Sequence, residues 1–177
     1  MASVSIGDRA PAFELPGVDG KRYSLSAISS GKKATAVVFM CNHCPYVLAW
    51  LDRLNAVAKD YAAQDVAFVG INANDAVKYP ADSFAAMQQL AAEQELPFPY
   101  LHDEAQQVAT AYGAQRTPEV FMFDADLKLR YHGAPDDNYD DPQAKVPYLR
   151  QALDAVLAGQ EPPVADTPPV GCTIKWK

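Results

Sequence analysis

The sequence predicts an α/β domain in which helices flank a central mixed sheet. Residues 34–40 and 66–72 are continuous apolar runs of strand length, a pattern typical of strands buried in the middle of a sheet. Between them, apolar residues recur at helical spacing from Val47 to Tyr61, with charged and polar residues on the other face. A strand, a helix and a strand in this order form a βαβ unit, whose strands we expect to be parallel.

Segments before and after this unit complete the predicted fold. A hairpin is expected around Asp19-Gly20, because this dipeptide favours a tight turn between short apolar segments. Gly113 and Gly159 are placed to end helices, because glycine readily takes the left-handed conformation that follows a last helical turn. The further predicted elements are hairpin strands 12–15 and 21–24, helices 81–95, 104–112 and 142–158, and strands 119–123 and 127–131.

Composition limits the number of domains and the classes of partner. With 177 residues and an apolar fraction of 49%, the chain is long enough for one domain with a sizeable core. We expect that domain to span residues 1–159, followed by a proline-rich tail over 160–177 that packs back on it. The net charge of −7 argues against nucleic acid or a membrane surface as partner, because both attract basic proteins. The first nine residues lack the basic and apolar parts of a secretory signal, so we expect a cytoplasmic protein.

Two cysteines stand between the first buried strand and the long helix, in the segment Cys41-Asn42-His43-Cys44. A helix N-terminus offers unpaired N–H groups and the positive end of the helix dipole, and both favour a thiolate over a thiol. Pro45 suits the first helical position, where its missing N–H is not needed. We therefore expect Cys44 near the helix cap, facing solvent with a lowered pKa, and a protonated His43 would add to that shift.

Other roles for these cysteines stay open at this point. They could be inert apolar packing, although polar residues and a proline interrupt the apolar run. They could also bind a soft metal ion, with Cys41, His43, Cys44 and Cys172 as the ligands, although the sequence holds no second Cys-x-x-Cys pair. The position of the pair before a helix favours redox chemistry over both alternatives.

Four segments together resemble the thioredoxin-like superfamily and, within it, the peroxiredoxin-like redoxins related to alkyl hydroperoxide reductase and thiol-specific antioxidant proteins. They are GDRAPAFELPGVDGKRYSLSAI near the N-terminus, CNHCPYV, RTPEVFMFD and the ending GCTIKWK, and they span nearly the whole chain. The resemblance implies a thioredoxin-like fold with an N-terminal β-hairpin extension and an extended C-terminal tail. It also implies thiol-based redox activity, for which we expect no cofactor.

In this resemblance Cys44 occupies the position of the nucleophilic cysteine. The second thioredoxin cysteine falls on Val47, so the Cys41/Cys44 pair is displaced by one turn toward the strand. Val38 stands where thioredoxins carry a buried acid, six residues before the nucleophile. The peroxidase signature upstream of Cys44 is missing, and Pro118 replaces the arginine that supports peroxide cleavage in peroxiredoxins, so we expect no efficient peroxidase.

Thr117-Pro118 carries a further mark of the superfamily. The resemblance implies a cis peptide bond here, with the Thr117 backbone beside Cys44 and able to pair with an extended substrate. A trans proline that opens an edge strand is the alternative. We assign Thr117, Pro118, Pro45 and His43 to the substrate-binding surface.

The tail is the third feature that bears on chemistry. It carries four prolines before Cys172 and is expected to be extended. At about 3.1 Å per residue, roughly twelve residues reach about 35 Å, enough to return Cys172 to the active site. Cys172, Ile174 and Trp176 share one parity, so a strand-like ending turns all three inward. A disordered tail is the alternative, but its apolar residues argue against that.

Three functional hypotheses follow. The first is a thiol–disulfide oxidoreductase in which Cys44 attacks and Cys41 or Cys172 resolves the mixed disulfide. Its substrates would be disulfides or oxidised thiols of proteins or small molecules, and a thioredoxin- or glutathione-type donor would reduce it. The second is a thiol-dependent peroxidase with antioxidant activity. The third is the soft-metal-binding protein described above.

Overall fold

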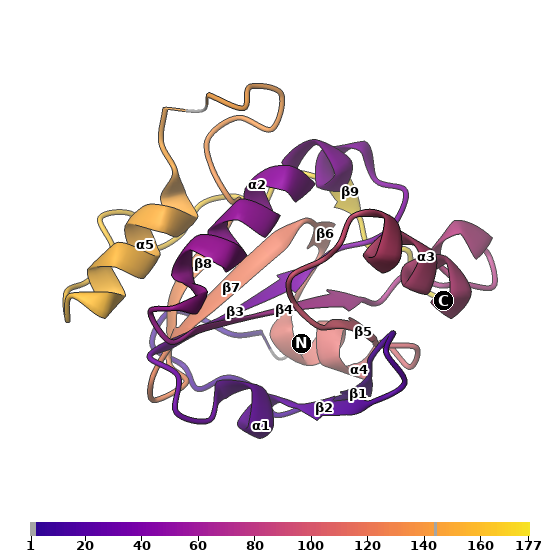
Figure 1. Ribbon diagram of the computed structural model, residues 1–177, viewed down its shortest axis with the longest axis horizontal. Helices are drawn as coiled ribbons and strands as arrows, with labels where there is room; N and C mark the ends of the chain where they lie inside the picture. Colours follow the sequence, from indigo (N-terminus) through magenta and orange to yellow (C-terminus); the bar gives the residue numbers. More distant parts are fainter. Residues whose placement is uncertain (1–2, 144) are drawn as a thin grey trace.

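A computed structural model describes residues 3–143 and 145–177. The first two residues of the predicted domain 1–159 and position 144 of the predicted last helix lie outside the described residues. Figure 1 shows a central sheet with helices on both of its faces. The protein therefore has the mixed α/β architecture of the thioredoxin-like fold, which confirms the fold class predicted from the sequence.

Five strands form the central sheet in the order β5-β4-β3-β7-β8. Strands β3, β4 and β5 run parallel, whereas β7 runs antiparallel to both β3 and β8. The bounds of these strands are Ala34–Phe39 (β3), Val66–Asn72 (β4), Tyr100–His102 (β5), Glu119–Asp124 (β7) and Leu129–Gly133 (β8). Two short sheets pair β1 (Glu14–Pro16) with β2 (Arg22–Ser24), and β6 (Arg116–Thr117) with β9 (Cys172–Thr173).

Alternate side chains of the central strands pack into two separate hydrophobic cores, one on each face of the sheet. In β3, Ala36 and Val38 face the layer of helices α2 (Pro45–Ala62), α3 (Phe84–Glu93) and α5 (Tyr148–Leu157). Val37 and Phe39 face the layer of α1 (Leu25–Ser29) and α4 (Gln107–Tyr112). All four side chains are buried, so the strand is apolar throughout rather than alternating.

Three predicted helices prove shorter than their apolar periodicity indicates, and one of them, predicted over 104–112, begins only at Gln107. Helix α5 begins at Tyr148 rather than at 142, because Pro147 occupies its N-cap and the residue before a proline avoids the helical conformation. The predicted range 81–95 divides at Ser83, whose hydroxyl accepts a hydrogen bond from the Ala86 N–H and caps α3. Pro80–Asp82 forms a separate 3-10 helix, η1. Among the described residues, no helix combines the length and apolarity that crossing a bilayer requires.

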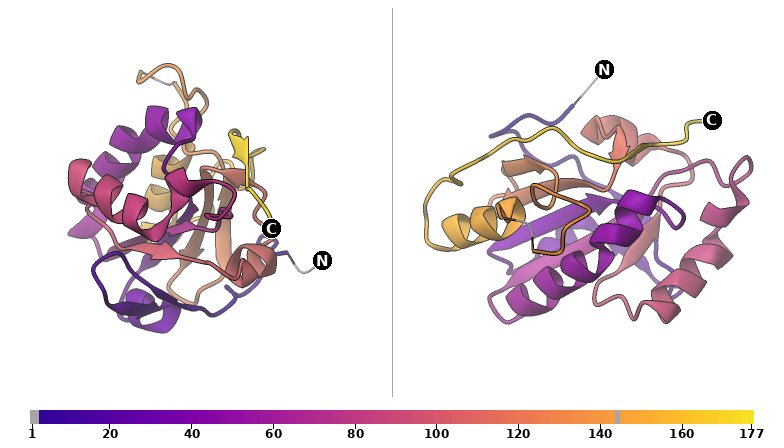
Figure 2. Two further views of the ribbon diagram at one scale, coloured as in Figure 1. Left: turned by 90° about the vertical axis from the view of Figure 1, so that its right-hand side faces the viewer. Right: turned by 90° about the horizontal axis from the view of Figure 1, so that it is seen from above.

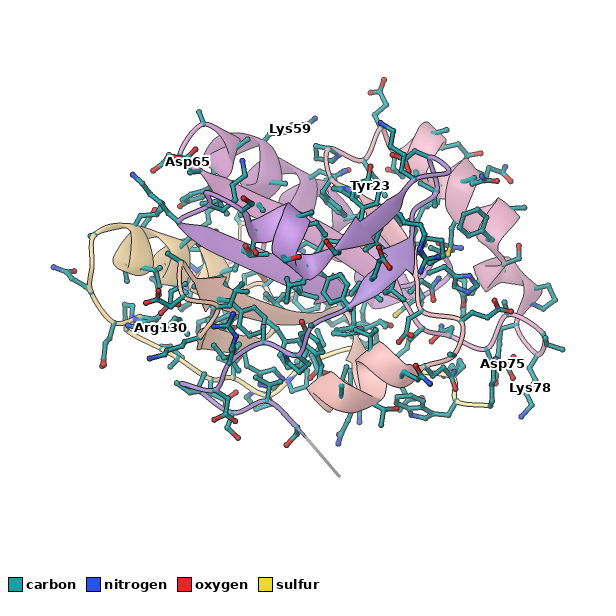
Figure 3. All side chains as sticks on the ribbon, turned by 90° about the horizontal axis from the view of Figure 1, so that it is seen from below. Tyr23, Lys59, Asp65, Asp75, Lys78 and Arg130 are labelled. Carbon is teal, nitrogen blue, oxygen red and sulfur yellow. The ribbon has the colours of Figure 1, made fainter. Side chains whose placement is uncertain are left out.

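The chain from residue 160 onward runs from the end of α5 back along the length of the molecule (Figure 2, right, yellow). It ends beside the segment after β4, where Figure 3 labels Asp75 and Lys78. There the Asp75 N–H donates to the Lys175 carbonyl at 2.8 Å. Strand β9 of this tail pairs antiparallel with β6, which places Cys172 opposite Thr117.

One expectation for the tail is wrong. Ile174 is buried at 3% exposure, but Trp176 is 42% exposed instead of sharing the same inner face. The strand pairing of β9 ends at Thr173, so the two-residue alternation of a strand does not continue to Trp176. Beyond β9, hydrogen bonds such as that from the Lys175 N–H to Asn74 Oδ1 (2.9 Å) direct the backbone instead.

His132 on β8 fastens the first part of the tail to the sheet. Its backbone N–H donates to the Ala165 carbonyl at 3.0 Å, and its carbonyl accepts from the Thr167 N–H at 2.9 Å. Its ring lies between two carboxylates, with Nε2 2.7 Å from Glu119 Oε2 and Nδ1 2.7 Å from Asp166 Oδ1. Burial disfavours the charged ring, but the contacts with Glu119 and Asp166 outweigh it, so the pKa of His132 is raised.

A raised pKa in the folded state makes stability depend on pH. Protonated His132 contributes to the free energy of unfolding. This contribution is complete below the ordinary histidine pKa of about 6.5, and it is lost as pH rises through the higher pKa of the folded state. We therefore expect the free energy of unfolding of the wild type to fall by about 1 kcal/mol above pH 6.5 relative to His132→Gln. Urea unfolding between pH 6 and 8.5 measures this difference, with Asp166→Asn as the variant that removes one partner. Parallel curves for the wild type and His132→Gln would contradict the assignment.

Candidate active site

The two cysteines before α2 meet the loop that precedes β7. Cys41 follows β3, and Cys44 is the N-cap of α2 with Pro45 at the first helical position, as predicted. The Sγ of Cys44 donates to the Thr117 carbonyl at 3.4 Å, and the Sγ of Cys41 lies 3.5 Å from Thr117 Oγ1. The Thr117–Pro118 bond is cis, which confirms that part of the sequence prediction.

The third cysteine arrives from the tail. Cys172 pairs with Thr117 across the β6/β9 ladder, and its thiol interacts with Cys44, so the third sulfur lies at the same site. The three cysteines are free thiols in this structure. The structure thus brings together the Cys41–Cys44 segment, Thr117 and Cys172, which come from three distant parts of the sequence.

The three thiols differ in their tendency to ionise. Donation from the Cys41 thiol is the largest of the effects that lower the pKa of Cys44 well below its ordinary value, and it outweighs the burial that opposes ionisation. The Cys172 thiol and the backbone N–H groups of Val47 and Cys172 act in the same direction. The same interaction with Cys44, followed by burial, raises the pKa of Cys41. Burial first, and then contact with Cys44, raises the pKa of Cys172 to about 11.

Cys44 does not face solvent, contrary to the sequence expectation. Its exposed fraction is 0%, and that of Cys41 is 1%. The surroundings of the Cys44 sulfur are nevertheless polar, since the Thr117 carbonyl, two thiols and backbone N–H groups adjoin it. The sequence could not show this burial, because part of the cover comes from a tail more than 120 residues away in the chain. A substrate reaches Cys44 only if part of this cover moves.

His43 contacts a carboxylate that the sequence pattern does not indicate. Its Nδ1 lies 2.6 Å from Oδ2 of Asp82, which is fully buried at the end of η1. The same carboxylate accepts from the Asn42 N–H at 2.7 Å and from the side-chain amides of Asn72 (3.2 Å) and Asn74 (3.0 Å). Asp82 therefore holds the Cys41–Cys44 turn to the end of β4. Strand Val66–Asn72 followed by Asn74 marks this polar end in the sequence, but nothing there indicates Asp82 as the acceptor.

A possible metal-ligand set differs from the one predicted. Within residues 3–143 and 145–177, ligand atoms of Cys41, His43 and Asp82 lie within 4.8 Å of one another, and Asp82 takes the place given to Cys44 and Cys172. Two ligands about 2.0–2.1 Å from a tetrahedral ion lie roughly 3.3 Å apart. The 2.6 Å between His43 and Asp82 is shorter, so the side chains are arranged for direct contact rather than around an ion.

Glu119 binds the backbone of the loop that carries Thr117. It is 2% exposed, and its Oε1 accepts the backbone N–H groups of Gln115 (2.8 Å) and Arg116 (2.9 Å). Its Oε2 contacts His132, which in turn holds the tail. No pattern in the sequence indicates a role for Glu119 or His132. Together they connect the loop of Thr117 to the tail that lies over it.

Comparisons with known proteins agree with this fold. Residues 6–132 match the AhpC/TSA family. An uncharacterized conserved protein from Geobacillus kaustophilus is 44% identical with a TM-score of 0.91, over 98% of this chain and 93% of that chain. A hypothetical protein from Sinorhizobium meliloti is 38% identical with a TM-score of 0.93, over 99% and 96% of the two chains.

A curated relative with a functional name is more distant. The thiol:disulfide interchange protein DsbE of Yersinia pestis is 29% identical over 140 residues, which are 78% of this chain and 69% of that protein. The family match covers most of the chain and includes both cysteines before α2 and the cis-proline loop. The protein therefore belongs to the AhpC/TSA family of thioredoxin-like redoxins.

Proposed function

We propose that the protein is a thiol–disulfide oxidoreductase with Cys44 as its nucleophile. The observation that carries this proposal is the position of Cys44 at the N-cap of an eighteen-residue helix, beside two further thiols that favour its ionised form. The AhpC/TSA family and the DsbE relative support the same reaction class. Thiols and disulfides of other molecules are then its substrates and redox partners.

The reaction proceeds by two exchanges of sulfur bonds. The Cys44 thiolate attacks one sulfur of the substrate disulfide, that bond breaks, and the other substrate sulfur leaves as a thiolate. Cys41 or Cys172 then loses its proton and attacks the Cys44 sulfur, which releases the second substrate thiolate. The substrate gains two electrons, and the protein is left with an internal disulfide that an external dithiol or two glutathione-type thiols reduce.

Thr117 and the residues around it position this exchange. The Thr117 carbonyl and hydroxyl contact the sulfurs of Cys44 and Cys41, so they limit where each sulfur can lie. Pro45 leaves the first helical turn without an N–H at that position, and the Val47 N–H favours the Cys44 thiolate. His43, held by Asp82, serves to position the Cys41–Cys44 turn rather than to contact substrate.

Replacing the nucleophile tests the proposal directly. We expect Cys44→Ser to reduce a chromogenic aryl disulfide no faster than buffer, because serine cannot form the attacking thiolate. Cys172→Ser is the matched control, since it keeps Cys44 and Cys41 and should retain the first exchange. Stopped-flow release of the aryl thiolate measures both. Equal rates for Cys44→Ser and the wild type would reject Cys44 as the nucleophile.

The disulfide formed after turnover identifies the resolving thiol. We expect a linkage that includes Cys44 after treatment with one equivalent of a small disulfide. Trypsin cleaves after Lys33 and Arg53, so a Cys41–Cys44 bond stays within one peptide, whereas a bond to Cys172 joins two peptides. Mass mapping distinguishes the two products. A Cys41–Cys172 bond with Cys44 left reduced would contradict the cycle.

A thiol peroxidase is the second candidate, favoured by the family match and by the lowered pKa of Cys44. Pro118 stands where the resemblance to peroxiredoxins requires an arginine, so the group that would polarise a bound peroxide is missing from that position. We expect hydrogen peroxide to oxidise Cys44 no faster than it oxidises an ordinary free thiolate, because the sulfur is covered and lacks that arginine. Rapid mixing with peroxide gives this rate, and a value several orders of magnitude higher would favour the peroxidase.

A further inference from the structure

The tail backbone lies directly against the group that holds Cys44. A Cβ placed on Gly171 would lie 1.9 Å from the Thr117 carbonyl oxygen and 2.6 Å from its carbon, so a side chain has no room there. The same oxygen accepts the Cys44 Sγ at 3.4 Å. Next along the tail, the N–H and thiol of Cys172 both interact with Cys44. These residues close the cover over the nucleophile.

The part of the tail that covers Cys44 is anchored on its N-terminal and C-terminal sides and makes few contacts between these anchors. Upstream, the tail is bound to His132 through Ala165 and Thr167. Downstream, the buried Ile174 donates its N–H to the Gln115 carbonyl at 2.9 Å. Between these anchors, β9 is a two-residue ladder without a disulfide. A segment with so few contacts can open locally while the domain stays folded.

We propose that residues 170–173 form a removable strap over Cys44 that stands in the place of a substrate strand, and that a protein substrate displaces it with an extended segment in which glycine precedes the reactive cysteine. This inference rests on the proposed thiol–disulfide exchange at Cys44. Lifting the strap leaves the N–H and C=O groups of β6 without partners, and such groups need to be paired again. An incoming antiparallel strand supplies those partners.

The contacts of Gly171 indicate which sequence the substrate segment carries. The Thr117 carbonyl excludes a β-carbon at that position, so the residue before the cysteine is glycine. The guanidinium of Arg116 donates to the Gly171 carbonyl at 2.9 Å and can bind the corresponding carbonyl of a substrate. Cys172, opposite Thr117, marks where the substrate cysteine lies. The substrate class is therefore a disulfide in an extended Gly-Cys segment of another polypeptide.

The strap is tested first without any substrate. Gly171→Ala forces the tail away from Thr117, and we expect it to raise the rate of Cys44 alkylation by iodoacetamide roughly tenfold or more, because the short ladder is lost. Thr173→Ala, an exposed position on the same strand, is the matched control and should leave the rate near that of the wild type. Peptide mass mapping follows Cys44 alone, and circular dichroism confirms that each variant is folded.

If Gly171→Ala does not fold, Ile174→Ala carries the same test, because it removes the buried anchor on the other side of Cys172. If a folded strap variant has its Cys44 alkylated at the wild-type rate, the proposal that the strap covers Cys44 is wrong. Fast alkylation of the wild type, at the rate of a free thiolate, would overturn it as well.

The substrate class is tested with peptides that copy the tail. We expect the disulfide-linked dimer of VGCTIKW to be reduced by Gly171→Ala at least several-fold faster than that of VACTIKW, which differs only at the residue before the cysteine. Equal rates would overturn the glycine requirement. A small aryl disulfide tests the proposed function separately from the glycine requirement. If Gly171→Ala exposes Cys44 but reduces that compound no faster than free cysteine does, the proposed thiol–disulfide exchange is wrong, and this result does not depend on the strap.

Discussion

Thr117 makes the contacts on which the rest of the site depends. Its carbonyl accepts the Cys44 thiol, its hydroxyl contacts Cys41, and its strand pairs with Cys172. The sulfurs of Cys41 and Cys44 thus contact Thr117, and the Cys172 thiol lies beside Cys44. Because a thiol is a weak hydrogen-bond donor and acceptor, their relative acidity depends on this close arrangement rather than on any single strong bond. The exchange proposed for Cys44 depends on that geometry.

The fold explains why these parts meet. Strands β3 and β7 are neighbours in the sheet, with Phe39 opposite Glu119, so the residues just after β3 lie beside those just before β7. The start of α2 and the loop of Thr117 therefore share one end of the sheet. The tail then reaches the same end because His132 and Ile174 hold it on either side of Cys172. Apolar packing of the sheet places the start of α2 and the loop of Thr117, and a few polar contacts place the tail.

The sequence predicted what depends on local pattern and missed what depends on distant contacts. The apolar runs identify β3 and β4, and Pro45 after Cys44 identifies the start of α2. Short elements such as β5 and β6 carry too few residues to show a period. The buried Asp82 accepts hydrogen bonds from three asparagines of other segments, which no spacing in the chain displays. The burial of Cys44 likewise depends on the docked tail.

A buried thiolate requires donors to replace the water it has lost, and the closed site supplies them. Cys41 and Cys172 donate through their thiols, and Val47 and Cys172 through their backbone N–H groups. In the proposed open state the sulfur would lose both donors of Cys172 but gain water. A substrate strand that takes the same register brings its own backbone N–H to the position of the Cys172 N–H. In the proposed cycle Cys44 would therefore keep a donor up to its attack on the substrate, because Cys41 belongs to the body of the domain rather than to the strap and its thiol stays beside Cys44 until the resolving step.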